Sequence, residues 1–157
     1  MDDQHQFIED MGLYFEATGL TRMAGRIIGW LLICDPAHQS MPDIITALSA
    51  SKSAISTALA LLRQLDLVDI VRLPNERKDH FKLNADLWSH AFQARAHQIA
   101  ELRTLSERGL ALLEDAPPEM RRRLQLMYEM NVFMEAEFRK LIERWNEVKQ
   151  EKGLADL

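Results

Sequence analysis

Residues 40–83 read SMPDIITALSASKSAISTALALLRQLDLVDIVRLPNERKDHFKL, and this stretch decides the fold. Ser40 and Ser51 are both good helix N-caps, because a serine hydroxyl can accept a hydrogen bond from a free backbone N–H of the first turn. Apolar residues recur at helical spacing after each of these serines. Only residues 49–50 separate the two segments. The pattern therefore predicts a helix, a tight turn and a second helix.

The segment after the second helix changes its apolar period from that of a helix to that of a strand. Residues 68–73 and 80–83 each predict a strand, and the polar turn 74–79 joins them. A two-stranded wing that directly follows a helix-turn-helix is the winged-helix arrangement. We therefore expect a mainly α fold with a small β-hairpin, in which a winged helix-turn-helix is flanked by long helices.

The flanking helices are visible as apolar residues at helical period. They cover residues 3–18, 21–33, 86–113 and 119–150. The second of them contains Gly25 and Gly29 on one face. Each glycine costs about 1 kcal/mol in a helix interior relative to alanine. The presence of both glycines predicts a close crossing with another helix.

The last predicted helix is about 50 Å long, which is too long for the core of one small domain to cover. Its apolar residues follow alternating spacings of four and three, which is a heptad seam. The seam comprises Met120, Leu124, Met127, Asn131, Met134, Phe138, Leu141, Trp145 and Val148. A single asparagine in such a seam, here Asn131, fixes the register of a coiled coil. The seam predicts dimerisation, and packing against residues 86–113 of the same chain is the alternative; both can hold together.

Composition and charge limit the classes of partner. The chain has 157 residues and a formal net charge of −5, which excludes a uniformly basic nucleic-acid binder. The charge is unevenly distributed, because residues 20–84 hold eight Lys and Arg against six Asp and Glu, whereas the flanks hold eleven against eighteen. We therefore expect an anionic partner to bind the central segment.

The sequence also indicates the compartment. The longest uncharged apolar run, residues 27–34, is far shorter than the roughly 20 residues of a membrane span. Residues 1–7 lack the basic start and apolar centre of a signal peptide. We expect a cytoplasmic protein without membrane contact. The single cysteine, Cys34, excludes an internal disulfide, and we interpret it as a buried small side chain, with a redox switch as the alternative.

The outer face of the second helix of the pair is narrow enough to enter the major groove of DNA. This face comprises Lys52, Ser53, Ser56, Thr57 and Ala60. Hydroxyls can donate to or accept from base edges, and methyl groups can pack on thymine methyls. The helix starts at Ser40 and Ser51 offer backbone N–H groups to phosphates. The hairpin carries Arg72, Arg77 and Lys78, and we expect these side chains to contact the adjacent DNA backbone or minor groove. A solvated helix face and a solvated turn are the alternative.

Three segments carry a resemblance to a known family. They are GLTRMAGRIIGWLL at residues 19–32, SKSAISTAL at residues 51–59 and RLPNERKDHF at residues 72–81. Through them the first half of the chain resembles the GbsR-like branch of the MarR family of transcriptional regulators, and the second half resembles it in helical character. The family usually has Pro where Thr21 stands, Gly where Asn75 stands and Tyr where Phe81 stands.

The resemblance implies a homodimeric repressor of transcription that binds a palindromic double-stranded DNA operator and is released by a small-molecule effector. It implies an N-terminal dimerisation helix in residues 1–18, a DNA-binding domain in 19–84 and a helical dimerisation region in 85–157. In this scheme Arg77 is the wing arginine that enters the minor groove. The implied dimer interface comprises Phe7, Met11, Met127, Asn131, Met134, Phe138, Leu141 and Trp145.

The resemblance also implies an effector pocket between the dimerisation helices and the DNA-binding domain. The candidate residues are Tyr14, Arg26, Trp30, Trp88 and Phe92. An aromatic cage suits a quaternary ammonium or an aromatic ligand, and core packing is the alternative for each aromatic residue. Arg22 and Arg26, one helical turn apart, either bind an anionic effector or pair with an acidic neighbour; we favour the pairing.

Other functional classes receive less support from the sequence. The chain lacks a Gly-rich phosphate loop, an HExxH motif and a nucleophile elbow, so we expect neither an enzyme nor a cofactor. His90, His97 and Glu101 share a helical face and could bind a metal with a fourth ligand from elsewhere, but we favour a solvated face. The rival to a DNA-binding regulator is a winged-helix protein-interaction module, which the negative net charge favours. Salt dependence separates the two, because log K for DNA falls with log salt by about 0.9 per phosphate contacted.

Overall fold

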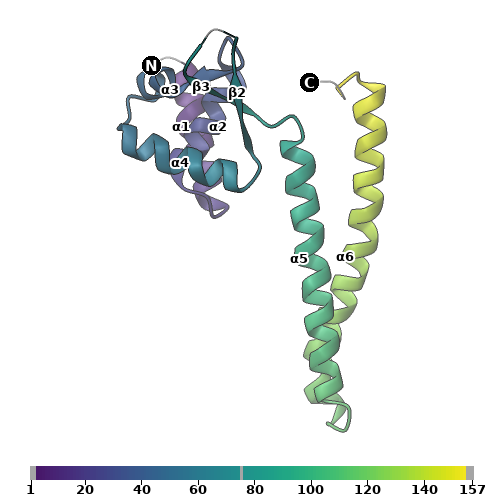
Figure 1. Ribbon diagram of the computed structural model, residues 1–157. Helices are drawn as coiled ribbons and strands as arrows, with labels where there is room; N and C mark the ends of the chain where they lie inside the picture. The colour runs from purple at the N-terminus through teal and green to yellow at the C-terminus, as the bar shows by residue number, and fades with distance from the viewer. Residues whose placement is uncertain (1–2, 75, 155–157) are drawn as a thin grey trace. The chain divides into compact units, whose positions relative to one another are not determined.

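The computed structural model describes residues 3–74 and 76–154 and contains two compact units, Met1–Leu87 and Trp88–Leu157. The elements in chain order are α1 (Asp3–Ala17), α2 (Arg22–Ile33), β1 (Gln39–Ser40), α3 (Met41–Leu48), α4 (Lys52–Gln64), β2 (Val68–Arg72), β3 (Asp79–Leu83), α5 (Leu87–Leu112) and α6 (Pro118–Glu151) (Figure 1). The expected fold class, mainly α with a small β-hairpin after a helix-turn-helix, is confirmed. Each of the four flanking helices begins and ends within one residue of its predicted bounds.

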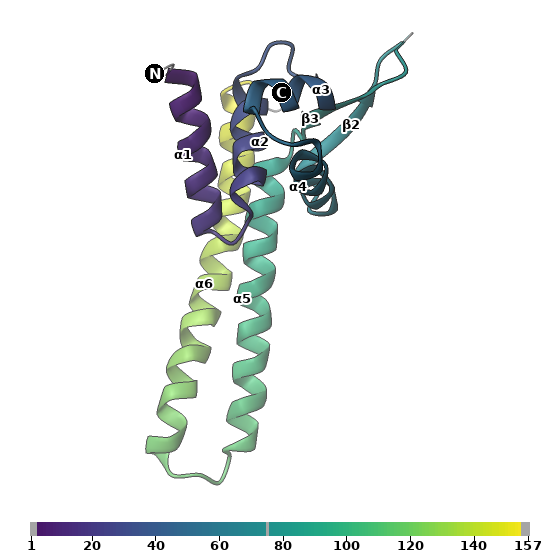
Figure 2. The same ribbon diagram turned by 90° about the vertical axis from the view of Figure 1, so that its left-hand side faces the viewer.

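Helices α1 and α2 of the first unit lie side by side (Figure 2). A Cβ atom added at Gly25 would lie 2.7 Å from the backbone oxygen of Met11, and one at Gly29 would lie 3.0 Å from Met11 Cβ. The two glycines therefore allow the helix backbones to approach closely, and the predicted crossing is confirmed. Gly19, at φ +100°, follows the end of α1 and turns the chain toward α2.

Three helix starts carry side-chain caps, and those at Ser40 and Ser51 are the ones that the sequence predicted. The hydroxyl of Thr21 accepts a hydrogen bond from the N–H of Ala24 at the start of α2. At α3 the Ser40 hydroxyl and the Asp43 carboxylate form a reciprocal capping box. The Ser51 hydroxyl accepts from the N–H of Ala54 at the start of α4. These bonds satisfy N–H groups that would otherwise have no partner within the helix.

The sheet is antiparallel and has the strand order β1-β3-β2. Strands β2 and β3 form the predicted hairpin, with Val68 opposite Leu83 and Arg72 opposite Asp79. Strand β1 pairs with β3 along its far edge, and the sequence analysis did not predict it. A strand of two polar residues has no apolar alternation to reveal it. Its partner, β3, also lies in a distant part of the chain, so no local turn signals the pairing. Asn75, within the predicted turn, lies outside the described residues.

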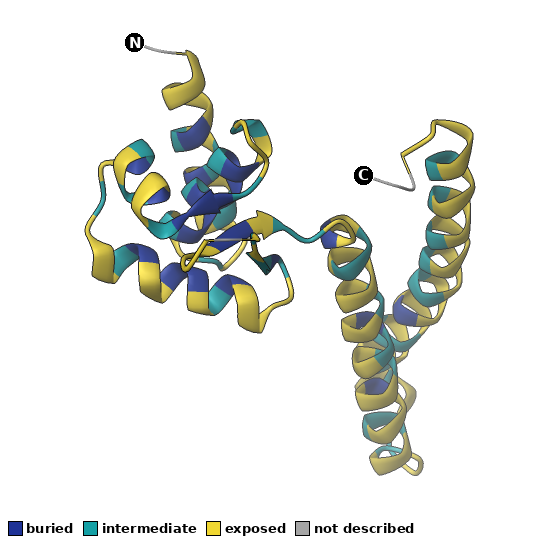
Figure 3. Ribbon diagram, turned by 45° about the horizontal axis from the view of Figure 1, so that its top comes forward, coloured by how far each residue is buried: buried dark blue, intermediate teal, exposed yellow. Residues whose placement is uncertain are grey.

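One hydrophobic core holds the first unit together, and every one of its four helices contributes to it. Its fully buried large side chains are Ile27, Ile28, Ile44, Leu48, Ile55 and Leu62. From the hairpin, Val68 and Phe81 are buried against the same core. Figure 3 shows that α4 turns one face to this core and leaves the other exposed. The core thus fixes which residues of α4 and of the hairpin face outward.

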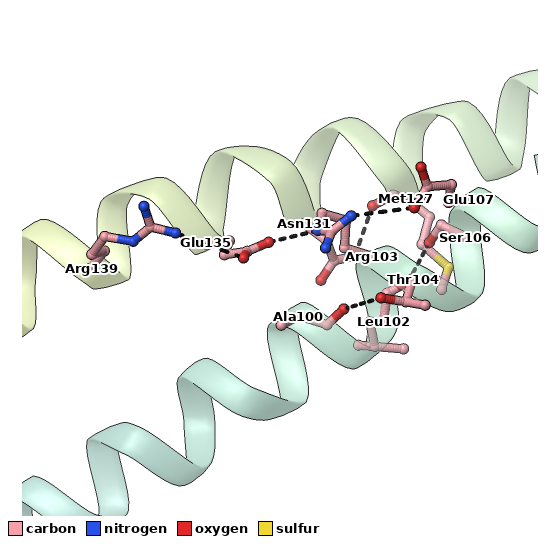
Figure 4. Close-up of polar contacts among 10 residues, drawn as sticks. All are labelled: Ala100, Leu102, Arg103, Thr104, Ser106, Glu107, Met127, Asn131, Glu135 and Arg139. Carbon is pink, nitrogen blue, oxygen red and sulfur yellow. Dashed lines mark hydrogen bonds and ion pairs between the residues drawn. The ribbon is translucent and has the colours of Figure 1, made fainter.

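The second unit is an antiparallel hairpin of the two long helices α5 and α6 (Figures 1 and 2). Arg103 of α5 donates a hydrogen bond from Nε to Glu135 Oε2 of α6 over 2.7 Å (Figure 4). Near the turn of the hairpin, a Cβ atom at Gly109 would lie 3.0 Å from Leu124 Cδ1, so glycine gives Leu124 room against α5. The predicted packing of the last helix against residues 86–113 therefore involves both apolar and charged contacts.

Much of the apolar surface of α6 is nevertheless exposed in the single chain. Its exposed large apolar residues include Met120, Leu126, Met130, Val132, Phe133 and Leu141. Leu126, Met130 and Phe133 recur at helical spacings of four and three, and an exposed apolar stripe of this kind is typical of an interface. Among the described residues, no single helix has the length and apolarity needed to cross a membrane. Only α3 and α4 taken together meet that test, and they are bent by 115° with respect to each other.

We predict that Gly25→Ala lowers the free energy of unfolding by about 1–3 kcal/mol, because the new methyl group meets backbone atoms of α1 that cannot move independently. Gly29→Ala is the matched control and should cost less, since the atom nearest to its added Cβ, Met11 Cβ, lies 3.0 Å away, against 2.7 Å for the Met11 backbone oxygen at Gly25. Urea unfolding followed by circular dichroism measures both. A Gly25→Ala protein as stable as the wild type would contradict the close crossing.

Candidate nucleic-acid interface

The outer face of α4 has the exposure that the sequence analysis expected. Lys52, Ser53, Ser56, Thr57 and Ala60 are all exposed. The opposite face, with Ile55, Ala58, Leu59 and Leu62, is buried in the core. At the start of the helix the hydroxyls of Ser51 and Ser53 lie 3.1 Å apart, within hydrogen-bonding distance. The result is a rigid helix that presents small polar side chains to solvent.

The hairpin presents the basic side chains predicted for a wing. Arg72, Arg77 and Lys78 are exposed. Arg72 Nε lies 3.3 Å from Asp79 Oδ1 across the two strands, an exposed pair of a kind that contributes little to stability. Near the base of the wing, His80 Nε2 lies 3.2 Å from Glu76 Oε2, and His80 itself is buried. The wing cations are therefore available to an anionic partner.

Ser40 differs from the other candidate DNA-binding residues, because it is only 3% exposed. Its backbone N–H donates to Asp43 Oδ2 over 3.0 Å, and its hydroxyl donates to the same oxygen. The hydrogen bond from the Ser40 hydroxyl lowers the pKa of the Asp43 carboxyl below its usual value; burial acts in the opposite direction and is outweighed. A phosphate contact by the Ser40 hydroxyl would require it to leave Asp43.

The five candidate effector residues do not form a single cluster within either unit. Tyr14 is 61% exposed and makes an edge contact with Phe15. Trp30 lines an open cavity of about 600 Å³ beside β1 and the hairpin. Trp88 and Phe92 are exposed on α5, in the second unit.

Arg26, the remaining effector candidate, pairs with an acidic side chain, as the sequence analysis favoured. Arg26 Nε lies 2.6 Å from Glu9 Oε1, and Arg22 Nη2 lies 2.8 Å from Glu9 Oε2. Both arginines of α2 thus bind one carboxylate of α1. The sequence indicated an acidic partner but not which of the nearby carboxylates it is.

The candidate dimer residues fall into three groups in the single chain. Phe7 and Leu141 are exposed. Partly buried are Met11, Met127, Met134, Phe138 and Trp145. Asn131 is buried, and its Nδ2 donates to the backbone oxygen of Met127 on the same helix (Figure 4). Met11 packs on α2, so its predicted role at a dimer interface would come in addition to one inside the chain.

The metal and cysteine alternatives can be located as well. His97 Nε2 lies 3.4 Å from Glu101 Oε1, and both side chains are largely exposed. Within residues 3–74 and 76–154, no group of three His, Cys, Asp or Glu residues is arranged to hold a metal ion. Cys34 is half-buried, and burial raises the pKa of its thiol. A smaller fraction of the side chain is therefore in the reactive thiolate form at neutral pH.

Comparisons with known proteins agree with a helix-turn-helix regulator. Residues 86–149 match the family model for MmpR5-like MarR family transcriptional regulators. The HTH-type transcriptional regulator MmpR5 of Mycobacterium tuberculosis is 41% identical over 133 residues, which span 85% of this chain and 81% of that protein. The chain belongs to the MarR family of transcriptional regulators. A solved structure of a transcriptional regulator has a TM-score of 0.73 at 38% identity and covers 92% of this chain and 99% of its own.

Membership of the MarR family decides several questions left open by the sequence. The protein is a regulator of transcription with a helix-turn-helix DNA-binding unit, and regulators of this family are not enzymes. The family that the resemblance indicated is therefore confirmed. The matched model describes MmpR5-like regulators, and the GbsR-like branch stays a prediction.

We predict that Ser40→Ala destabilises the protein by about 1 kcal/mol through loss of the N-cap and raises the pKa of Asp43 toward its usual value. Because the folded pKa of Asp43 is lowered, its stabilising contribution is present above the unfolded pKa, near pH 4, and is lost as the pH falls through the folded value. Urea unfolding at pH 3 and pH 7, with NMR titration of Asp43, measures both. The exposed Ser56→Ala is the control, and an equal loss in both variants would contradict the cap.

Proposed function

We propose that this MarR-family regulator binds a palindromic operator as a homodimer and represses transcription until a small-molecule effector releases it. The observation that carries the proposal is the outer face of α4, where five small or polar residues are exposed on a helix whose other face is buried. A helix held in this way can enter the major groove without rearrangement of the core.

The chemistry of this face suits base contacts. The hydroxyls of Ser53, Ser56 and Thr57 can donate to or accept from base edges, and the Thr57 and Ala60 methyl groups can pack against thymine methyls. Lys52, in the first turn of α4, adds a positive charge where backbone N–H groups point toward solvent. Together these groups combine base contacts with a phosphate contact at the end of the helix.

The wing supplies the second contact in this proposal. Arg77 and Lys78 lie between β2 and β3 and are exposed. A narrow minor groove has a strong negative potential, which attracts the positively charged side chain of arginine. The local excess of Lys and Arg in residues 20–84 supports the same partner, although the whole chain is acidic. Binding should therefore weaken steeply as salt rises.

Dimerisation is supported by the exposed apolar side chains of α6, above all Phe133 and Leu141. We propose that residues 1–18 and 85–157 contribute the interface and that residues 19–84 bind DNA. Two α4 helices related by a twofold axis would contact half-sites about 10 bp apart. A cavity of about 430 Å³ in the α5–α6 hairpin has apolar lining residues such as Ile99, Leu102 and Met134 and also polar ones, Arg95, Gln98, Glu101 and Asn131, and we propose it as a place where an effector binds within a single chain.

The second candidate is a regulator whose winged helix acts as a protein-interaction module without binding a specific operator, because the net charge of −5 opposes binding to DNA. The test is binding of purified protein to DNA upstream of its own coding region and to sequences selected from a randomised pool, at two salt concentrations. Specific binding that weakens with salt supports the DNA-binding regulator. Absence of binding to both would favour the interaction module.

We predict that Arg77→Ala weakens operator binding about tenfold and makes the salt dependence shallower by about one phosphate contact. Arg108→Ala is the matched control, since it removes the same charge from an exposed position on α5. Fluorescence anisotropy with a labelled operator at several salt concentrations measures both variants. Equal affinities of Arg77→Ala and the wild type would remove Arg77 from the interface.

We predict that Leu141→Glu converts the dimer to a monomer and abolishes tight operator binding, because a carboxylate would be buried in an apolar interface. Leu141 is 50% exposed in the single chain, so the change should leave the fold intact. Asn146→Glu, about 140° around the same helix, is the control. Size-exclusion chromatography with light scattering gives the mass of each, and a dimeric Leu141→Glu protein would exclude this seam.

A further inference from the structure

Arg26 of α2 makes polar contacts with two other helices at once. Its Nε lies 2.6 Å from Glu9 Oε1 on α1, and its Nη2 donates to the backbone oxygen of Leu48 over 2.9 Å. Leu48 is the last residue of α3. A single guanidinium therefore joins α1, α2 and the end of the first helix of the helix-turn-helix.

The acceptor on α3 is one of the carbonyl groups that a helix leaves unpaired at its C-terminus. Ser49 follows it in the left-handed conformation, with φ 48°, and the turn then leads to the cap of α4 at Ser51. A cation at the C-terminal end of a helix is also favoured by the helix dipole. Arg26 thus holds the turn that sets the direction of α4.

The α1 helix contains a residue whose small size makes room for this arginine. A Cβ atom at Gly12 would lie 2.8 Å from Arg26 Cγ and 3.2 Å from Arg22 Cγ. Gly12 is buried in the middle of α1, where glycine costs about 1 kcal/mol relative to alanine. The space that Gly12 leaves is occupied by the side-chain stems of the two arginines.

Arg22 offers a natural comparison, because it binds the same carboxylate but does not reach α3 in the contacts described. Its side chain is 48% exposed, against 15% for Arg26. Burial raises the pKa of Glu9, but the hydrogen bond from Arg22 and the charges of both arginines outweigh it and lower that pKa. Glu9 therefore stays ionised at neutral pH and anchors Arg26 to α1.

We propose that Arg26 is a positioning residue that couples α1 to the helix-turn-helix and holds α4 at the angle required for specific operator binding. The inference rests on the proposed function. Arg26 itself need not touch DNA, because it acts through the Leu48 carbonyl and the turn that follows. A shift of α1 relative to α2 would move the anchor of Arg26 and, through it, the end of α3.

The test compares Arg26→Gln with Arg22→Gln in the full chain, first without DNA. The amides of Ser49 and Ala50 donate to Thr46 and Ile45 at the end of α3, so their hydrogen exchange reports opening of the turn. We expect faster exchange at both amides in Arg26→Gln and near wild-type exchange in Arg22→Gln. Equal exchange in the two variants would overturn the inference.

The second measurement is affinity for the operator and for unrelated DNA, at a temperature where unfolding curves show every variant to be folded. Arg26→Gln should lose about tenfold in operator affinity and keep its affinity for unrelated DNA. The ratio of operator affinity to affinity for unrelated DNA therefore falls, whereas a general loss of stability would leave this ratio unchanged. An unchanged ratio in Arg26→Gln would overturn the inference. If the wild type binds no operator, the proposed function fails, while the exchange comparison still decides the contact with the turn.

Two further variants protect the test from a folding failure. Arg26→Lys keeps the charge but lacks the planar fork that contacts Glu9 and Leu48 together. It should therefore change hydrogen exchange and operator specificity in the same direction as Arg26→Gln does. Gly12→Ala keeps both arginines and displaces the Arg26 stem. Wild-type exchange and specificity in both variants would contradict a positioning role.

Discussion

Burial of α2 is the constraint on which the first unit depends, because α1, α3, α4 and β3 all pack against this one helix. Ile27 and Ile28 are fully buried at its centre, and Gly25 brings the α1 backbone into direct contact with its face. Any element placed on α2 therefore has its inner face determined by the same core. The outward faces of α4 and of the hairpin follow from that packing.

The helices of this fold could be predicted from the sequence because their determinants are local. Apolar spacing marks all the helices, a capping serine or threonine marks the starts of α2, α3 and α4, and Gly19 and Pro117 mark stops within a few residues. Strand β1 could not be predicted, because its only structural signal is its pairing with β3. For the same reason Ser40 was interpreted as a cap near solvent, whereas it is a cap that is also buried in the sheet.

The candidate site likewise contains features that the local sequence predicts and features that depend on how distant segments pack. Exposure of Ser56 and Thr57 follows from helical periodicity alone, since Ile55 and Leu59 must face the core. The effector candidates depend on which helices converge, and periodicity carries no information about that. The contact of Arg26 with the Leu48 oxygen was also hidden, because every residue has a backbone carbonyl and nothing in the sequence distinguishes the one that needs a partner. The Arg103–Glu135 pair across the α5–α6 hairpin is a further example.

The separation between the two faces of α4 has an evolutionary consequence. Residues such as Ser56 and Thr57 contribute no apolar side chain to the core, so exchanging them costs little in folding and, in the proposed complex, would alter the groups offered to DNA. If α4 reads the operator as proposed, a duplicated gene would change its promoter preference through one or two substitutions, while the buried face of α4 continues to specify the same fold. Diversification of target genes is thus open to this scaffold without a prior gain in stability.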